Sequence, residues 1–208
     1  LLMHKVLSSI IVSNEKAQLL LLRSKAIDCL ASVLSELPTN YTFYQQIFEL
    51  FHAITNDELK TEIMGKILLN FNIWINADEH LQLQIYRDWS RTLNSKYNQY
   101  TKRHLTCISL LRNLRRFFWY NPIETNIIYI NQALRKNRER EGAQEKISNI
   151  RSSLLQIIHS IAHDHLTYHD LSILIVHIVS CRDYLQVIDL LKFLKLLIIS
   201  PESPVFRF

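Results

Sequence analysis

Apolar residues recur at intervals of three and four along most of the chain, the period of an α-helix that buries one face. No segment shows a convincing alternation of apolar and polar residues, which a half-buried strand would have. Short links between antiparallel helices imply layered helical hairpins. The pattern predicts helices at residues 2–12, 15–22, 25–36, 42–54, 57–70, 78–94, 101–119, 145–163, 168–180 and 184–199.

Several of these helices begin with a recognisable capping signal. Thr55 with Glu58, and Thr167 with Asp170, have the spacing at which a side-chain oxygen accepts from first-turn amides while an acid lies near the positive end of the helix dipole. The polar run at residues 78–80 stands at a predicted helix start with its side chains in different directions, so it is expected to cap the helix rather than to form a reaction site.

Helix pairs recur at about the length of HEAT and armadillo repeats. The sequence therefore predicts an all-α fold, an α-solenoid of stacked antiparallel helices. We expect residues 1–208 to form a single armadillo-like helical domain, with residues 121–144 as a charged loop or insert. Apolar outer faces on the first and last helices predict an interior piece of a longer solenoid, with further helical repeats of the same chain at both ends.

Composition limits the remaining fold classes and functions. The chain has 208 residues, of which 48% are hydrophobic and 21% charged, so it can bury a sizeable core. Only 2 glycines and 4 prolines occur, which leaves almost no material for Gly-rich phosphate loops or β-sandwich turns. Its isolated cysteines, Cys29, Cys107 and Cys181, favour a reducing cytosolic compartment over a disulfide framework. The most apolar windows are short or interrupted by charges, as expected of core helices.

Basic residues concentrate between residues 101 and 140, where nine Lys or Arg stand against Glu124 and Glu139. Such a patch would attract an acidic protein segment or anionic lipid head groups. A solvated helix face followed by a charged loop is the alternative interpretation. The candidate patch residues are Lys102, Arg103, Arg112, Arg116, Arg135, Lys136, Arg138 and Arg140.

The predicted helix at 101–119 separates its apolar and basic residues. Its apolar face holds Cys107, Leu110, Leu111, Leu114, Phe117 and Phe118, and its polar face holds Ser109, Arg112, Asn113 and Arg116. Base-stacking platforms need exposed aromatic rings interleaved with cations, so this separation disfavours nucleic-acid binding. A helical-repeat nucleic-acid-binding or transport-adaptor module that uses the basic patch stays as the alternative function.

Histidines cluster at the predicted junction of two helices, at His159, His163, His165 and His169. His159 and His163 lie one turn apart and could share a metal, but the glutamate of a His-Glu-x-x-His site is missing and no cysteine lies nearby. The sequence also lacks a Gly-x-Ser-x-Gly elbow and a P-loop. We therefore expect no metal, no cofactor and no enzymatic activity.

Three stretches resemble the armadillo-like domain of neurobeachin-type BEACH proteins. They are "ILLNFNIWINADEHLQLQIY" (67–86), "LTCISLLRNLRRFFWY" (105–120) and the segment at 150–198 that begins "IRSSLLQIIHS". The matching motif residues are Phe71, Ile73 and Trp74, then Leu110, Leu111, Leu114, Arg115, Phe117 and Phe118, then Ile150, Arg151, Ser153 and Leu154.

The resemblance implies a non-enzymatic scaffold segment of a very large cytosolic protein that acts in vesicle trafficking and membrane dynamics and associates peripherally with membranes. Its motifs consist mostly of packing residues. It therefore marks structural anchors rather than a reaction site, and Trp74 is expected to be a buried contact between repeats. These anchors are Phe71, Trp74, Leu111, Leu114, Arg115 and Phe118.

Overall fold

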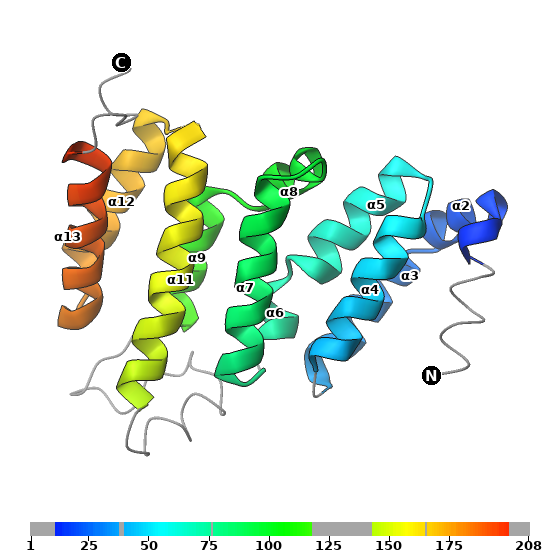
Figure 1. Ribbon diagram of the computed structural model, residues 1–208, viewed down its shortest axis with the longest axis horizontal. Helices are drawn as coiled ribbons and strands as arrows, with labels where there is room; N and C mark the ends of the chain where they lie inside the picture. The colour runs from blue at the N-terminus through cyan, green and yellow to red at the C-terminus, as the bar shows by residue number, and fades with distance from the viewer. Residues whose placement is uncertain (1–10, 38–39, 76, 118–142, 165, 200–208) are drawn as a thin grey trace. The chain divides into compact units, whose positions relative to one another are not determined.

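The computed structural model describes residues 11–37, 40–75, 77–117, 143–164 and 166–199 (Figure 1). Every regular element in these ranges is a helix, so the predicted all-α fold is confirmed. The chain divides into two compact units. The first comprises Leu1–Ala77 and Lys96–His104, and the second comprises Asp78–Ser95 and Leu105–Phe208.

The first unit packs short helices around an aromatic core. Trp74 is fully buried, its ring meets that of Tyr44 edge to face at 5.1 Å, and its Nε1 donates a hydrogen bond of 2.9 Å to the carbonyl oxygen of Ile67. The elements of this unit are α2 (Glu15–Arg23), α3 (Ala26–Glu36), α4 (Tyr41–Ala53), α5 (Asp57–Ile63), the π-helical turn η1 (Met64–Leu68), α6 (Phe71–Trp74) and α8 (Asn98–His104).

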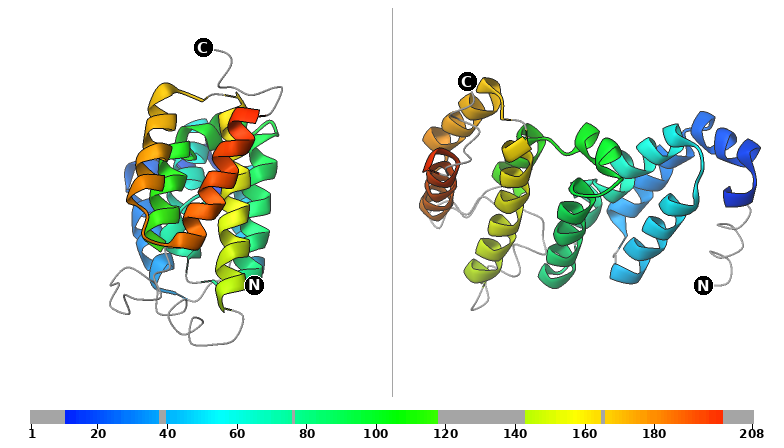
Figure 2. Two further views of the ribbon diagram at one scale, coloured as in Figure 1. Left: turned by 90° about the vertical axis from the view of Figure 1, so that its left-hand side faces the viewer. Right: turned by 45° about the horizontal axis from the view of Figure 1, so that its top comes forward.

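The second unit consists of helices in two layers (Figures 1 and 2). In one layer α11 lies between α7 and α13, and these helices run in the same direction. In the other layer α9 packs against α12, and α9 also packs against α11. The elements are α7 (Glu79–Leu93), α9 (Cys107–Phe117), α11 (Ala143–Asp164), α12 (Tyr168–Ser180) and α13 (Tyr184–Ile199).

Polar side chains begin many of these helices, because the first-turn amides have no partner inside the helix. Asp78 accepts a hydrogen bond of 2.9 Å from the amide of Leu81, as expected for the start of α7. Thr167 and Asp170 form the predicted capping box at the start of α12. Asparagine caps the helices that begin after Asn14, Asn40, Asn56 and Asn70.

The predicted cap at Thr55 is wrong by one residue. The side chain of Asn56 accepts from the amide of Leu59 at 2.8 Å and begins α5. The hydroxyl of Thr55 instead donates to Oε1 of Gln18 at 3.2 Å. Gln18 is fully buried. Thr55 therefore joins α2 to the α4–α5 link rather than capping a helix.

The predicted helix at 101–119 is interrupted, because α8 ends at His104 and α9 begins at Cys107. Leu105 between them is buried, and Thr106 and Ser109 cap α9 reciprocally. The amide of Ser109 donates to Oγ1 of Thr106 at 3.2 Å, and the amide of Thr106 donates to Oγ of Ser109 at 3.0 Å. The apolar period continues across this break and so conceals it.

The remaining helix predictions agree with the structure to within a few residues, and those at 168–180 and 184–199 agree with α12 and α13. The predicted helix at 57–70 changes to a π-helical turn at Met64–Leu68, and the ring of His104 lies so close to Gly65 there that a Cβ would overlap it. Most of the predicted helix at 2–12 lies outside the described residues. So does the predicted insert at 121–144, apart from its last two residues, which begin α11.

Candidate functional site

The outward face of α11 carries short polar side chains in place of the apolar ones that fill the core. Because α7 flanks α11 on one side and α13 on the other, this face forms a ridge between two grooves. Ser152 and Gln156 line both grooves. The α11 ridge consists of Ser148, Asn149, Ser152, Ser153, Gln156 and Ser160.

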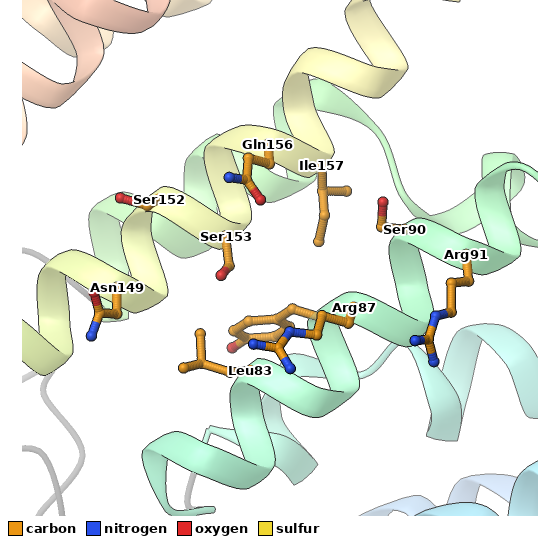
Figure 3. Close-up of a pocket in the computed structure, with 10 residues that line it drawn as sticks. Leu83, Arg87, Ser90, Arg91, Asn149, Ser152, Ser153, Gln156 and Ile157 are labelled. Carbon is orange, nitrogen blue, oxygen red and sulfur yellow. The ribbon is translucent and has the colours of Figure 1, made fainter.

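The α7–α11 groove has a volume of about 640 Å³ (Figure 3). Hydrogen-bonding side chains dominate its walls, and the buried side chains of Tyr86 and Ile157 lie at its base. The polar groups are Arg87, Ser90 and Arg91 from α7 and Asn149, Ser152, Ser153 and Gln156 from α11.

Charge is distributed unevenly along this groove. Arg91 is 77% exposed and pairs with Asp88 at 3.1 Å, whereas the exposed Arg87 has no ion pair within the described ranges. Nδ2 of Asn149 donates to Oε1 of Glu79 at 3.1 Å, which ties the second turn of α11 to the first turn of α7. The groove is therefore positive near Arg87 and Arg91 and meets an acid at the other end.

The α11–α13 groove has a similar volume, about 680 Å³, and a more mixed lining. Leu155, Phe193 and Leu196 supply apolar surface, and Asp189 and Lys192 supply charges of opposite sign. The ring of His159 lies against that of Phe193 at 6.3 Å in an edge-to-face arrangement. This groove is suited to apolar contacts with a polar border.

A buried ionic cluster fixes α11 to α13 beneath the ridge. Arg151 is 2% exposed, and its Nη1 and Nε reach Oδ2 of Asp183 at 3.2 Å and Oδ2 of Asp189 at 3.0 Å. Oδ1 of Asp183 also accepts from the amides of Leu185 and Gln186, which begins α13. One carboxylate thus starts α13 and holds α11 against it, so the ridge has a fixed position.

Gln186 extends this cluster to the second layer. Its Oε1 lies 3.3 Å from Nε2 of His177 and accepts from the thiol of Cys181 at 3.1 Å, and its Nε2 donates to the carbonyl oxygen of Leu114 at 3.5 Å. The side chain of Gln186 is completely buried and contacts groups on α9 and α12. The sequence signal for this cluster is the presence of Asp and Gln in an otherwise apolar run, since such groups are rarely buried without partners.

The basic patch predicted from the sequence is only partly described. Lys102 and Arg103 are exposed on α8 of the first unit, and Arg112 is exposed on α9 of the second unit. The side chain of Arg116 and the whole of Arg135, Lys136, Arg138 and Arg140 lie outside the described residues. The patch therefore stays a prediction.

The motif residues proposed as anchors are buried where the structure describes them. Phe71 and Trp74 lie in the core of the first unit, and Leu111 and Leu114 lie in the core of the second. The side chain of Arg115 and the whole of Phe118 lie outside the described residues. Arg151, which also belongs to the motif, is the center of the ionic cluster rather than a simple packing residue.

Burial makes the thiol of Cys107 a poor candidate for a nucleophile. Burial, with a smaller contribution from Asp170, raises the pKa of Cys107 to about 12, so its thiol is not a nucleophile. In the part of the chain that the structure describes, no three His, Cys, Asp or Glu side chains could together hold a metal ion, and His165 lies outside that part. Within the same ranges, each helix is too short or too polar to cross a bilayer.

Stacked helical layers with an exposed polar ridge are typical of helical-repeat proteins. A family model described as the alpha-solenoid region (DUF4704) of neurobeachin and BDCP matches residues 2–207. The chain therefore belongs to this family, which confirms both the neurobeachin-type resemblance and the predicted α-solenoid. Searches of curated proteins and of solved structures found no match.

Proposed function

We propose that the chain is a non-enzymatic interaction scaffold, a segment of a neurobeachin-type BEACH protein that acts in vesicle trafficking and membrane dynamics. Its partners are proteins that bind along the α11 ridge, and its location is the cytoplasm, in peripheral association with membranes. The observation that carries the proposal is the ridge itself, a polar surface between two grooves of about 640 and 680 Å³.

The contacts that hold α11 against its neighbours support this proposal. A preorganised surface binds with a smaller loss of conformational entropy than a mobile one. α11 is held to α13 by Arg151 and to α7 by the hydrogen bond between Asn149 and Glu79. The exposed side chains of the ridge are therefore presented in a fixed register, as a docking surface requires.

Site-specific photocrosslinking in cells tests the proposal. A photoreactive phenylalanine analogue replaces Ser152 on the ridge or, as the control, Arg112, which is exposed on α9 of the same unit. We expect discrete protein adducts from position 152, absent at position 112, that disappear when Gln156→Trp blocks both grooves. In a mixture of purified proteins, each identified partner should also form an adduct at position 152 and lose it in the Gln156→Trp variant. Equal adducts at both positions would contradict the proposal.

The alternative function is nucleic-acid binding or transport adaptation through the basic patch predicted from the sequence, of which Lys102 and Arg103 are exposed in the first unit and Arg112 in the second. Binding through phosphates releases counterions, so the logarithm of affinity should fall linearly with the logarithm of salt concentration. Titration of a fluorescent single-stranded RNA at several salt concentrations distinguishes this function, because a protein partner held by the ridge should show a much weaker dependence.

Further helical repeats of the same chain are the second class of partner that we propose. α12 and α13 expose many large apolar side chains, with Val179 81% exposed, and solenoid repeats bury such faces against their neighbours. The chain alone should bind a hydrophobic dye in its folded state, and lengthening it by a helical pair should suppress this binding. The exposed residues are Tyr168, Ile175, Val176, Val179, Tyr184, Leu191, Leu196, Ile198 and Ile199.

A further inference from the structure

We propose that the α7–α11 groove binds an extended, acidic segment of a partner protein and that Arg87 selects its carboxylate. This inference rests on the proposed scaffold function and gives it a defined ligand chemistry. It depends on the length of the groove, on its unpaired hydrogen-bonding groups and on its charge.

The length of the groove corresponds to a short extended peptide. Its lining on α7 runs from Leu83 to Arg91, which at 1.5 Å per residue is about 12 Å of helix. An extended chain advances by about 3.3 Å per residue, so about four peptide residues would lie along the groove. Asn149 and Ile157 mark a similar length on α11.

The walls of the groove offer hydrogen-bonding groups that nothing else uses. In the described part of the chain, the side chains of Ser152, Ser153 and Gln156 make no hydrogen bond. Figure 3 shows Ser153 and Gln156 on the side of α11 that faces the groove. An extended peptide carries an amide and a carbonyl at every residue, and the hydroxyls and the Gln156 amide can pair with both.

The charge of the groove indicates which side chains a bound peptide should carry. Arg87 is exposed without an ion pair among the described residues, and no acidic side chain lines the groove. A guanidinium binds a carboxylate through two parallel hydrogen bonds, which gives both strength and direction. Arg91 adds positive charge that Asp88 partly offsets. Because Glu79 lies near the Leu83 end of the groove, the acidic residue is expected between Arg87, at the middle of the groove, and Arg91.

The base of the groove argues against a single-stranded nucleic acid as the occupant. Base stacking needs an exposed aromatic face, but Tyr86, the aromatic residue of this groove, is 1% exposed and donates its hydroxyl to Gln82 at 3.2 Å. The groove therefore provides hydrogen bonds and one strong cation without a stacking platform, which suits a peptide.

Peptide pools test the inference directly. The purified 208-residue chain is immobilised and exposed to biotinylated octapeptides that are randomised except for one central residue, fixed as Glu, Gln, Lys or Phe. We expect the wild type to retain the Glu pool about fivefold more than the Gln pool. Arg87→Gln should remove this preference and Arg87→Glu should transfer it to the Lys pool. The matched control Arg112→Gln changes the same charge outside the groove and should leave the preference intact.

The outcomes separate this inference from the proposed function. Equal retention of the Glu and Gln pools, or an acidic preference that survives Arg87→Glu, would overturn the acidic-peptide proposal. If Ser153→Trp, which fills the groove, instead removes binding of the Lys or Phe pool, partner binding at the ridge stands and the assignment of acidic ligands fails. Hydrogen exchange in α9 and α12 verifies that each variant keeps its fold.

Discussion

The two units bury polar anchors of different kinds. In the first unit the anchor is a neutral amide, Gln18, which is fully buried. In the second unit it is an ion cluster formed by Arg151, Asp183 and Asp189. Both anchors join helices that the apolar core alone would hold less specifically, but they differ in what happens when one member is lost.

In the first unit, the side chain of Gln18 alone makes all the hydrogen bonds of the anchor. Oε1 of Gln18 accepts from the amide and hydroxyl of Thr55 and from the amide of Asn56, at 3.0 to 3.3 Å. Its Nε2 donates to the carbonyl oxygens of Ile11 and Val12 at 3.1 and 3.3 Å. All of its partners are neutral polar groups, so its loss leaves no charge without a partner.

The ion cluster depends on its cation, because removing Arg151 leaves the buried Asp183 and the part-buried Asp189 without compensation. The first unit instead draws specificity from packed rings around Trp74 and Tyr44. We conclude that the first unit should be most sensitive to the loss of aromatic volume and the second to the loss of a charge.

Trp74→Ala should lower the free energy of unfolding of the first unit by about 4 kcal/mol, because it leaves a large cavity and a carbonyl of Ile67 without its donor. Trp74→Phe keeps the ring contact with Tyr44 and should cost about half as much. Hydrogen exchange resolved by segment measures both variants, and α11 to α13 should keep their protection. A loss below about 1 kcal/mol would show that Trp74 is not an anchor.

Arg151→Ala should lower the free energy of unfolding of the second unit by about 3 kcal/mol, because Asp183 and Asp189 are left beside each other without their cation. The triple variant Arg151→Met, Asp183→Asn and Asp189→Asn removes every charge and should recover most of this loss, since asparagine can still begin α13. Denaturant unfolding followed by segment-resolved hydrogen exchange measures the effect.

Arg112→Ala is the matched control for Arg151→Ala, because Arg112 is an exposed arginine on α9 of the same unit. It should change the free energy of unfolding by less than about 0.5 kcal/mol. If both alanine variants cost equally little, the cluster does not anchor α13.

Gln18→Ala should lower the free energy of unfolding by about 2 kcal/mol, less than Trp74→Ala or Arg151→Ala, because the groups that it leaves unpaired are neutral. Gln45→Ala, at an exposed position of α4, is the control and should be nearly neutral. Thermal unfolding measures both. An effect of Gln18→Ala as large as that of Arg151→Ala would remove the distinction between a neutral and an ionic anchor.

The helices themselves could be predicted because burial of one face imposes a period on the sequence. The ends of α12 agree with the prediction because Thr167 and Asp170 form a capping box that sequence reveals. The break between α8 and α9 could not be seen by the same means, since Leu105 is buried and continues the apolar period across it. Only the short spacing of Thr106 and Ser109 signals it.

The site was less accessible to sequence reasoning than the fold. Ser152, Ser153 and Gln156 are ordinary side chains for an exposed helix face, and only the pairing of α7 with α11 gives them Arg87 as a neighbour. Arg151 was identified through a motif of packing residues, but its role depends on carboxylates more than thirty positions away. Such partners are set by tertiary structure rather than by local pattern.

The smallest effect that we predict concerns pH and the first unit. Burial is the main cause that lowers the pKa of both His52 and His104, with further lowering of the His52 pKa by Lys96 and Lys60. At His104 the Thr61 backbone and Glu62 oppose this shift and Arg103 adds to it. Because each folded-state pKa lies below the unfolded value of about 6.5, the unfolded chain binds more protons as the pH falls through that value.

The first unit should therefore lose stability on acidification from about pH 7 to the folded-state pKa values, by less than about 1 kcal/mol because both imidazoles remain partly solvated. The double variant His52→Gln and His104→Gln should flatten this dependence, whereas His80→Gln, at an exposed position of α7, should leave it unchanged. Segment-resolved hydrogen exchange at pH 5.5 and 7.5, corrected for intrinsic exchange rates, measures the difference. A dependence that persists in the double variant would assign the pH response to groups other than these histidines.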